Sequence, residues 1–352
     1  MRKIGTTLKI VFIIPFILLS ACKEKENVAP TVEIVTPPDG ATVLQAEIVP
    51  VKAMAEDEDG SITEINIYVE GDLVATAEAS SHVYNWNTAD LELGPYILSA
   101  TATDDEAKST AVNILVLVDN LGGLNPDLTY GSVSDIDGNS YGTIEIGTQV
   151  WMAENLKVSH YPDGTPITQI SDEAEWNAMT PDVQAYCWYD NLSEYSDTSG
   201  ALYTWAAAMN GELSIDTIPS GIQGVCPDGW HLPSDAEWKV LEMFLGMIQT
   251  DADNYDWRGS DEGAQLKETG FSKWEFSNSG GSNSSGFTAV PGGFRNAKGL
   301  FYSIDQSAAF WSTLAEEGTD NAWYRTLNFD REQVYRQYND MRLGFSVRCV
   351  KD

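Results

Sequence analysis

The chain has 352 residues, of which 43% are hydrophobic and 11% aromatic, so it can bury the cores of two or more domains. Its 53 acidic and 20 basic residues give a formal net charge of −33, which disfavours nucleic acid and anionic lipid headgroups as partners. This acidity is typical of a solvated extracellular surface, and binding of divalent cations is the alternative reading.

The first 22 residues predict an export signal that ends in a lipid attachment site. A basic start precedes ten apolar residues over 10–19, a run too short to span a bilayer. It closes on Leu19-Ser20-Ala21-Cys22, which resembles the lipobox of bacterial lipoproteins. The resemblance implies a diacylglycerol thioether on Cys22 and a lipid anchor in the cell envelope. The charged segment that follows predicts a tether over 23–29. We expect the outer membrane, with the cell surface as a hypothesis; a secreted protein with a chance cysteine is the alternative.

Residues 30–118 predict an all-β domain, because short runs of β-type residues alternate there with turns. The alternation of Val112, Ile114, Val116 and Val118 is typical of a strand with one buried face. No cysteine lies in this segment, which excludes a disulfide-centred antibody core. The stretches that resemble bacterial Ig-like modules are 30–40, 65–71, 84–86 and 100–104. The resemblance implies a β-sandwich that acts as a spacer.

A stretch rich in Gly, Asn and Pro over 119–132 predicts a linker. In the domain after it, over 133–352, we expect a hairpin turn at 135–139, then strands at 144–146 and 149–152. Helices are predicted at 172–179, 201–209, after Ser234 and within 259–268. Four β-type runs end the chain, at 310–313, 322–329, 333–338 and 344–350. This order of elements predicts an α+β domain.

One stretch of this domain, residues 226–238, joins a cysteine, a Pro-Asp-Gly turn and a helix start. Proline presets φ in the turn, and Gly229 is free to take a positive φ. Ser234 and Glu237 have the spacing of a capping box, so a helix should begin directly after Ser234. We expect His231, between two large apolar residues, to be a packed structural side chain.

Eight segments of the domain share a likeness with a known family: 135–139, 146–156, 186–189, 200–203, 226–238, 266–270, 286–295 and 344–350. Together they resemble the Fibrobacter succinogenes major paralogous domain. The resemblance implies the C-type lectin-like fold, which formylglycine-generating enzymes share. In that fold the N- and C-terminal strands pair and a long loop region carries the ligand site. The resemblance implies an architecture and carries no activity with it.

Three cysteines remain if Cys22 is lipidated, an odd number for an oxidising compartment. We expect a disulfide between Cys226 and Cys349, which would tie the turn before the helix to the last strand. Pairing of Cys187 with either of them is the alternative. The remaining thiol should be buried and inert.

The sequence contains only weak matches to known metal-binding patterns. The carboxylates of Asp251, Asp253, Asp256 and Glu262 echo a calcium loop, but Asp256 stands where an EF-hand needs glycine. Ca²⁺ is therefore only a weak candidate cofactor. In the first domain, turn roles account for Asp57, Asp59, Asp104 and Asp105, with calcium as the alternative. None of the three histidines has the spacing of a zinc site: His82, His160 and His231.

The most plausible ligand-binding surface combines flat rings with amide and guanidinium donors near the C-terminus. The candidate residues are Trp323, Tyr324, Arg325, Asn328, Tyr335, Arg336 and Tyr338. Strand alternation puts Trp323 and Arg325 on one face and Tyr324 on the other, so that one face is core and the other exposed. The alternative is that all the rings are packing residues.

The sequence therefore predicts a lipid-anchored envelope protein in which an Ig-like stalk presents a C-type lectin-like domain to a glycan or protein ligand. We predict no catalytic residue. The rival functions are a carbohydrate-active or formylglycine-generating type of enzyme, and a purely structural envelope protein. The active-site cysteine pair of the formylglycine-generating enzymes has no counterpart that we can place in this sequence.

Overall fold

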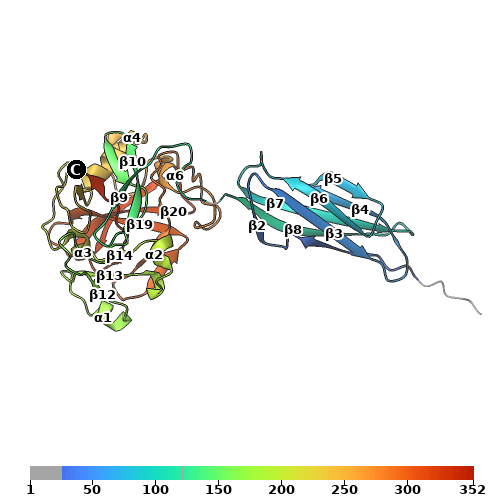
Figure 1. Cartoon of the computed structure of the whole chain (residues 1–352), viewed down its shortest axis with the longest axis horizontal. Helices are drawn as coiled ribbons and strands as arrows, with labels where there is room; N and C mark the ends of the chain where they lie inside the picture. Colours follow the sequence, from blue (N-terminus) through green and yellow to red (C-terminus); the bar gives the residue numbers. More distant parts are fainter. Residues whose placement is uncertain (1–25, 121) are drawn as a thin grey trace, which may run out of the picture. The chain divides into compact units, whose positions relative to one another are not determined.

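The computed structural model describes residues 26–120 and 122–352, which form an N-terminal and a C-terminal domain (Figure 1). Cys22 and the predicted signal segment lie outside the described residues. Within those residues, no helix has the length and apolar character needed to cross a bilayer.

The N-terminal domain is all β, as the alternation of short strands and turns predicts. Its strands are β1 (Thr31–Thr36), β2 (Ala41–Leu44), β3 (Ile48–Glu56), β4 (Ile62–Val69), β5 (Asp72–Ala77), β6 (Ser81–Asn87), β7 (Gly94–Asp104) and β8 (Ser109–Asp119). One sheet has the order β1-β3-β6 and the other the order β2-β8-β7-β4-β5. Strand β2 runs parallel to β8, whereas β4 is antiparallel to both β5 and β7.

The core of this domain follows from the period of two along each strand. Ile65 and Ile67 of β4 are fully buried, as are Leu98 of β7 and Val116 of β8, while the residues between them are more exposed. Trp86 is 3% exposed and is the only tryptophan of this domain. The alternating pattern in the sequence therefore identifies the buried face.

The C-terminal domain contains three sheets. It also has several short helices (Figure 1). A five-stranded sheet has the order β15-β22-β11-β10-β9, a three-stranded sheet β12-β13-β14, and a six-stranded sheet β16-β21-β20-β19-β17-β18. The strands are β9 (Gly131–Ser134), β10 (Ser140–Ile146), β11 (Gln149–Met152), β12 (Thr168–Gln169), β13 (Ala185–Cys187), β14 (Leu202–Tyr203), β15 (Trp230–His231), β16 (Asp256–Arg258), β17 (Gly292–Arg295), β18 (Phe301–Ile304), β19 (Ser307–Ala315), β20 (Asn321–Asn328), β21 (Val334–Asp340) and β22 (Val350–Lys351).

The helices are short, and two of them begin at caps that the sequence predicts. They are α1 (Glu173–Asn177), the 3₁₀ helix η1 (Tyr189–Asn191), α2 (Tyr195–Thr198), α3 (Trp205–Met209), α4 (Asp235–Phe244), α5 (Gln249–Ala252) and α6 (Glu262–Leu266). Asp172 caps α1, and Ser234 with Glu237 forms the predicted capping box of α4. With so few helical residues, the domain is mostly β-sheet.

Two of the predicted elements are wrong in extent. The helix expected over 201–209 begins only at Trp205, because Leu202 and Tyr203 pair with β13 and Thr204 then caps the helix. The strand expected over 344–350 is limited to Val350 and Lys351. The residues before it make only single bridges, such as that between Phe345 and Tyr203, since they thread through the core between sheets.

The end of the chain returns to the opening strands of this domain. Trp151 of β11 pairs with Val350 of β22, and the Met152 amide donates to the Cys349 carbonyl over 3.0 Å. Cys349 is bonded to Cys226, with their Cα atoms 5.9 Å apart, which is the disulfide expected from the sequence. The disulfide joins the turn before β15 to the last strand, and β15 pairs with the same strand.

Candidate functional site

The candidate surface residues lie on β20 and β21, two neighbouring strands in the middle of the six-stranded sheet. Trp323 pairs with Tyr338 and Arg325 with Arg336, so these four side chains share one face of the sheet. Tyr324 and Tyr335 belong to the opposite face, since strand neighbours alternate. The predicted set is therefore divided between two surfaces with different roles.

The first face carries a buried cluster of charges against α4. Asp235, the first residue of α4, accepts hydrogen bonds from Arg325 and Arg336 over 2.7–2.8 Å. Glu242, two turns along, accepts from Arg325 over 2.6 Å and from Arg258 over 2.7 Å. All five side chains are buried, so three guanidinium groups pair with two carboxylates away from water, with one positive charge in excess.

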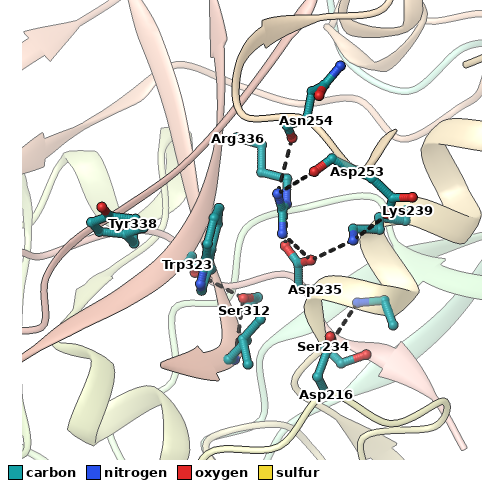
Figure 2. Close-up of polar contacts among 12 residues, drawn as sticks. Asp216, Ser234, Asp235, Lys239, Asp253, Asn254, Ser312, Trp323, Arg336 and Tyr338 are labelled. Carbon is teal, nitrogen blue, oxygen red and sulfur yellow. Dashed lines mark hydrogen bonds and ion pairs between the residues drawn. The ribbon is translucent and has the colours of Figure 1, made fainter. Parts of the chain in front are cut away.

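The electrostatics of the cluster follow from this geometry. Burial alone would raise the pKa of Asp235, but the guanidinium groups of Arg325 and Arg336 hold it well below its usual range. Figure 2 shows Arg336 between Asp235 and the backbone of Asp253 and Asn254. The Nη1 atom of Arg336 donates to the carbonyls of Asp253 and Asn254. Asp235 is therefore ionised at neutral pH.

The two arginines of this cluster are not part of an exposed binding surface, contrary to the prediction. Arg325 is fully buried and Arg336 is 6% exposed, so the prediction that they present donors to a ligand is wrong. The ring of Trp323 covers the Arg336 guanidinium at 3.9 Å, and Tyr338 packs on Trp323 at 5.2 Å (Figure 2). These two rings shield the cluster from solvent, which is a structural role.

The opposite face of the same sheet is an aromatic groove. Six rings follow one another with centroids 4.8–6.2 Å apart, in the order Trp257, Tyr335, Tyr324, Phe345, Phe294 and Tyr302. Five of them belong to strands of the sheet, and Phe345 comes from the segment before β22. Five of these rings, all but Tyr302, line a pocket of about 270 Å³. Its volume is near the lower end of the range of small-ligand pockets, about 300–1,000 Å³.

The groove has an apolar floor and a polar rim. Phe345 and Leu343 are almost fully buried at its floor, whereas Trp257 and Tyr335 are half-buried. The other lining residues are Ser307, Ala309, Thr326 and Asn339, which add two hydroxyls and an amide. Apolar surface with a few convergent polar groups is the usual composition of a ligand site.

The two tyrosine hydroxyls remain protonated at neutral pH. Burial, with a smaller contribution from Tyr335, raises the pKa of Tyr324 to about 12. Burial also raises the pKa of Tyr335, and the carboxylate of Asp256 adds to the effect. The Tyr324 hydroxyl can therefore donate a hydrogen bond to a ligand, whereas the Tyr335 hydroxyl, which donates to Asp256, can accept one.

Asn328, the last predicted member of the surface, lies at the end of β20. Its carbonyl accepts from the Nζ atom of Lys267 over 3.0 Å, and its side chain accepts from the Asp330 amide. Lys267 is fully buried and also donates to the carbonyls of Ser279 and Arg331. Asn328 thus helps to anchor a loop and does not line the groove.

The weak calcium candidates do not form a site. Asp253 pairs with Lys239 over 2.9 Å, and Glu262 is buried and accepts from the Ser260 amide. Asp256 accepts from Gln337, and Asp251 lies in α5. Across 26–120 and 122–352, no three His, Cys, Asp or Glu side chains come close enough together to hold a metal ion.

The remaining reactive side chains have structural positions. Ser159, His160 and Asp137 meet, but Nδ1 of His160 contacts both Ser159, at 3.1 Å, and Asp137, at 2.6 Å. A serine nucleophile and a carboxylate need opposite ring nitrogens, so this is no catalytic relay. Cys187 is fully buried, which raises the pKa of its thiol to about 12. Its thiol therefore stays protonated and unreactive.

His231 is packed as expected. Its Nε2 lies 2.8 Å from Glu237 and its Nδ1 lies 2.7 Å from Asp352. Burial would lower the pKa of His231, but the hydrogen bonds to the two carboxylates outweigh burial and raise it. Glu237 also accepts from the Ser234 amide, so one carboxylate joins β15 to the start of α4.

Sequence reasoning missed four of the six rings of the groove, namely Trp257, Phe294, Tyr302 and Phe345. A signal was present, because four strands of the sheet carry an aromatic residue followed directly by arginine. The pairs are Trp257-Arg258, Phe294-Arg295, Tyr324-Arg325 and Tyr335-Arg336. With a period of two, such pairs put every ring on one face and every arginine on the other.

Comparison with known proteins gives two family matches. The model of the Fibrobacter succinogenes major domain matches residues 144–351, and that of a bacterial Ig domain matches residues 30–100. Neither description names a catalytic activity. No curated protein matches the sequence.

Several solved structures match parts of the chain. Fibronectin(III)-like modules of Clostridium thermocellum CbhA are 22% identical over 26% of this chain, with a TM-score of 0.23, and the chain spans 47% of that protein. The PKD1 domain of Vibrio anguillarum Epp is 21% identical over 26% of this chain and 96% of its own, with a TM-score of 0.19. The Bacteroides ovatus protein SGBP-B, solved with a mixed-linkage heptasaccharide, is 10% identical over 42% of this chain and 52% of its own, also at 0.19.

These TM-scores are too low to carry an argument about fold or ligand. The family match is of a different kind, because it covers more than half of the 352 residues. The chain belongs to the Fibrobacter succinogenes major domain family, and a bacterial Ig domain precedes that domain.

Proposed function

We propose that this chain is an envelope lipoprotein whose C-terminal domain binds a glycan in the aromatic groove. The observation that carries the proposal is the row of six rings, five from the six-stranded sheet and Phe345 from the segment before β22. The ring faces of a groove of this kind can stack on the apolar faces of sugar rings. The hydroxyls at its rim can bond to sugar hydroxyls.

The architecture that we propose for this domain is the C-type lectin-like fold. Its support is the pairing of β11 near the start of the domain with β22 at the end of the chain, and the Cys226–Cys349 disulfide beside it. Helices and long loops lie between these strands in sequence. The groove belongs to the six-stranded sheet that these intervening residues build.

The proposal of a membrane anchor rests on the sequence alone. The apolar run over 10–19 and Cys22 predict lipidation, and the Ig-like domain would then act as a spacer. Stable attachment needs more than one acyl chain. Protease treatment of intact cells tests surface exposure, and complete protection of the protein would rule it out.

A matched pair of variants tests the groove. Tyr335 and Tyr338 lie on the same strand but on opposite faces, so both can be changed to alanine in a chain of residues 26–352. If Tyr335 is a central contact, Tyr335→Ala costs about 2 kcal/mol of binding, which is roughly a 30-fold loss of affinity. Tyr338→Ala should change affinity less than about twofold.

The readout is a glycan array followed by titration calorimetry on the glycan that binds. Circular dichroism confirms that each variant is folded. The proposal fails if no glycan binds the unmodified chain, or if Tyr335→Ala and Tyr338→Ala weaken binding equally.

A further inference from the structure

We infer that the aromatic groove selects uncharged glycans and excludes acidic ones, an inference that rests on the proposed glycan-binding function. The ten residues that line the pocket include no Asp, Glu, Lys, Arg or His. A ligand carboxylate or sulfate would therefore leave water without gaining an ionic partner, which costs free energy.

The four arginines that directly follow groove rings in sequence are directed away from the groove. Arg258, Arg325 and Arg336 bind the carboxylates of Asp235 and Glu242 on the opposite face. Arg295 donates its three nitrogens to the carbonyls of Gly299, Ile170 and Ser171. Because neighbouring residues of a strand face opposite ways, these four guanidinium groups do not face the groove.

Two further arginines lie near the groove and each is beside a carboxylate. Arg342, next to the groove residue Leu343, bonds to Asp340 over 3.0 Å. Arg331, whose guanidinium lies 5.6 Å from the Trp257 ring, is 3.7 Å from Asp330. Arg342 is thus paired, whereas Arg331, whose side chain is 50% exposed, is a loosely paired positive charge beside the Trp257 ring.

A negative charge also lies beside the groove. The carboxylate of Asp256 lies near enough to the Tyr335 hydroxyl to contribute to its raised pKa. The whole chain carries a formal charge of −33, which repels polyanions before they make contact. Neutral sugars avoid this repulsion and still supply apolar ring faces and hydroxyls.

The experiment compares three classes of oligosaccharide on the chain of residues 26–352, each titrated at low and at high salt. The neutral class includes β-glucan, mannan and N-acetylglucosamine oligomers, the acidic class oligogalacturonate and heparin fragments, and the cationic class chitosan oligomers. We expect a neutral ligand to bind with an affinity that changes less than about twofold with salt, because no ion pair forms.

Three other outcomes would each contradict the inference. Acidic oligosaccharides that bind more tightly than neutral ones would overturn the inference and leave the proposed function standing, provided that Tyr335→Ala removes the binding. Chitosan that binds more tightly than its N-acetylated parent would overturn it as well, in favour of a cation held by the rings and Asp256. Binding of no oligosaccharide would overturn the proposed function and the inference together.

Discussion

Replacing Asp235 by asparagine should destabilise the C-terminal domain severely, although the side chain keeps its size. Asp235 is fully buried and accepts from both Arg325 and Arg336. Removing its charge leaves three buried guanidinium groups with the single carboxylate of Glu242. Breaking a buried ion pair on one side costs about 3–5 kcal/mol.

Asp253 supplies the matched control. It also forms an ion pair, with Lys239 at 2.9 Å, but its side chain is 54% exposed. Asp253→Asn should therefore cost at most about 1 kcal/mol. The two variants make the same chemical change and differ mainly in burial.

Urea unfolding with tryptophan fluorescence measures the difference. Ten of the eleven tryptophans follow Trp86, so the signal reports the C-terminal domain. With an m-value of about 2 kcal/mol/M, the Asp235→Asn midpoint should fall by about 2 M. A cost below about 1 kcal/mol, or equal midpoints for the two variants, would refute the claim that this cluster ties α4 to the sheet.

The pH dependence of Asp235 has a definite sign. Its pKa is lowered in the folded state, so its stabilising contribution is present at neutral pH. That contribution is lost as the pH falls below about 3.9, the usual value for an aspartate, toward the lower folded value.

Three further predictions concern other parts of the domain. Reducing the disulfide between Cys226 and Cys349, which are 123 residues apart, should lower the unfolding free energy by about 2–5 kcal/mol, measured by urea melts with and without reductant. His231 has a raised pKa, so its stabilisation should be complete below about pH 6.5 and decline as the pH rises through the higher folded value. His231→Gln should remove this slope and His160→Gln should keep it. Cys187 should react with Ellman's reagent only in denaturant, and reaction in the native protein would contradict its burial.

Local signals in the sequence predict much of this structure. The capping box of Ser234 and Glu237 forms as expected, and the alternation in β8 gives its buried face. Each of these signals depends only on residues a few positions apart. The helix expected over 201–209 is wrong at its start, because Leu202 and Tyr203 pair with β13. That pairing joins residues too far apart in sequence for a local pattern to predict it.

The candidate site was predictable only in part. Tyr324 and Tyr335 are in the groove, but Arg325 and Arg336, which have the donors suited to a ligand, are in the core. Their partners Asp235 and Glu242 come about 90 residues earlier in the chain, so no local pattern links them. Alternation separates the residues into two faces, and only the fold shows which face α4 covers.

The buried charges also determine which side chains reach the ligand. If β21 slipped by one residue, Arg336 would enter the groove and Tyr335 would face Asp235. That register would leave a buried carboxylate without its partner, at a cost of several kcal/mol. Since the same aromatic-arginine order occurs in β16 and β20, the two acids of α4 fix the register of three strands. A charge cluster on one face of the sheet thus keeps the opposite face aromatic and uncharged.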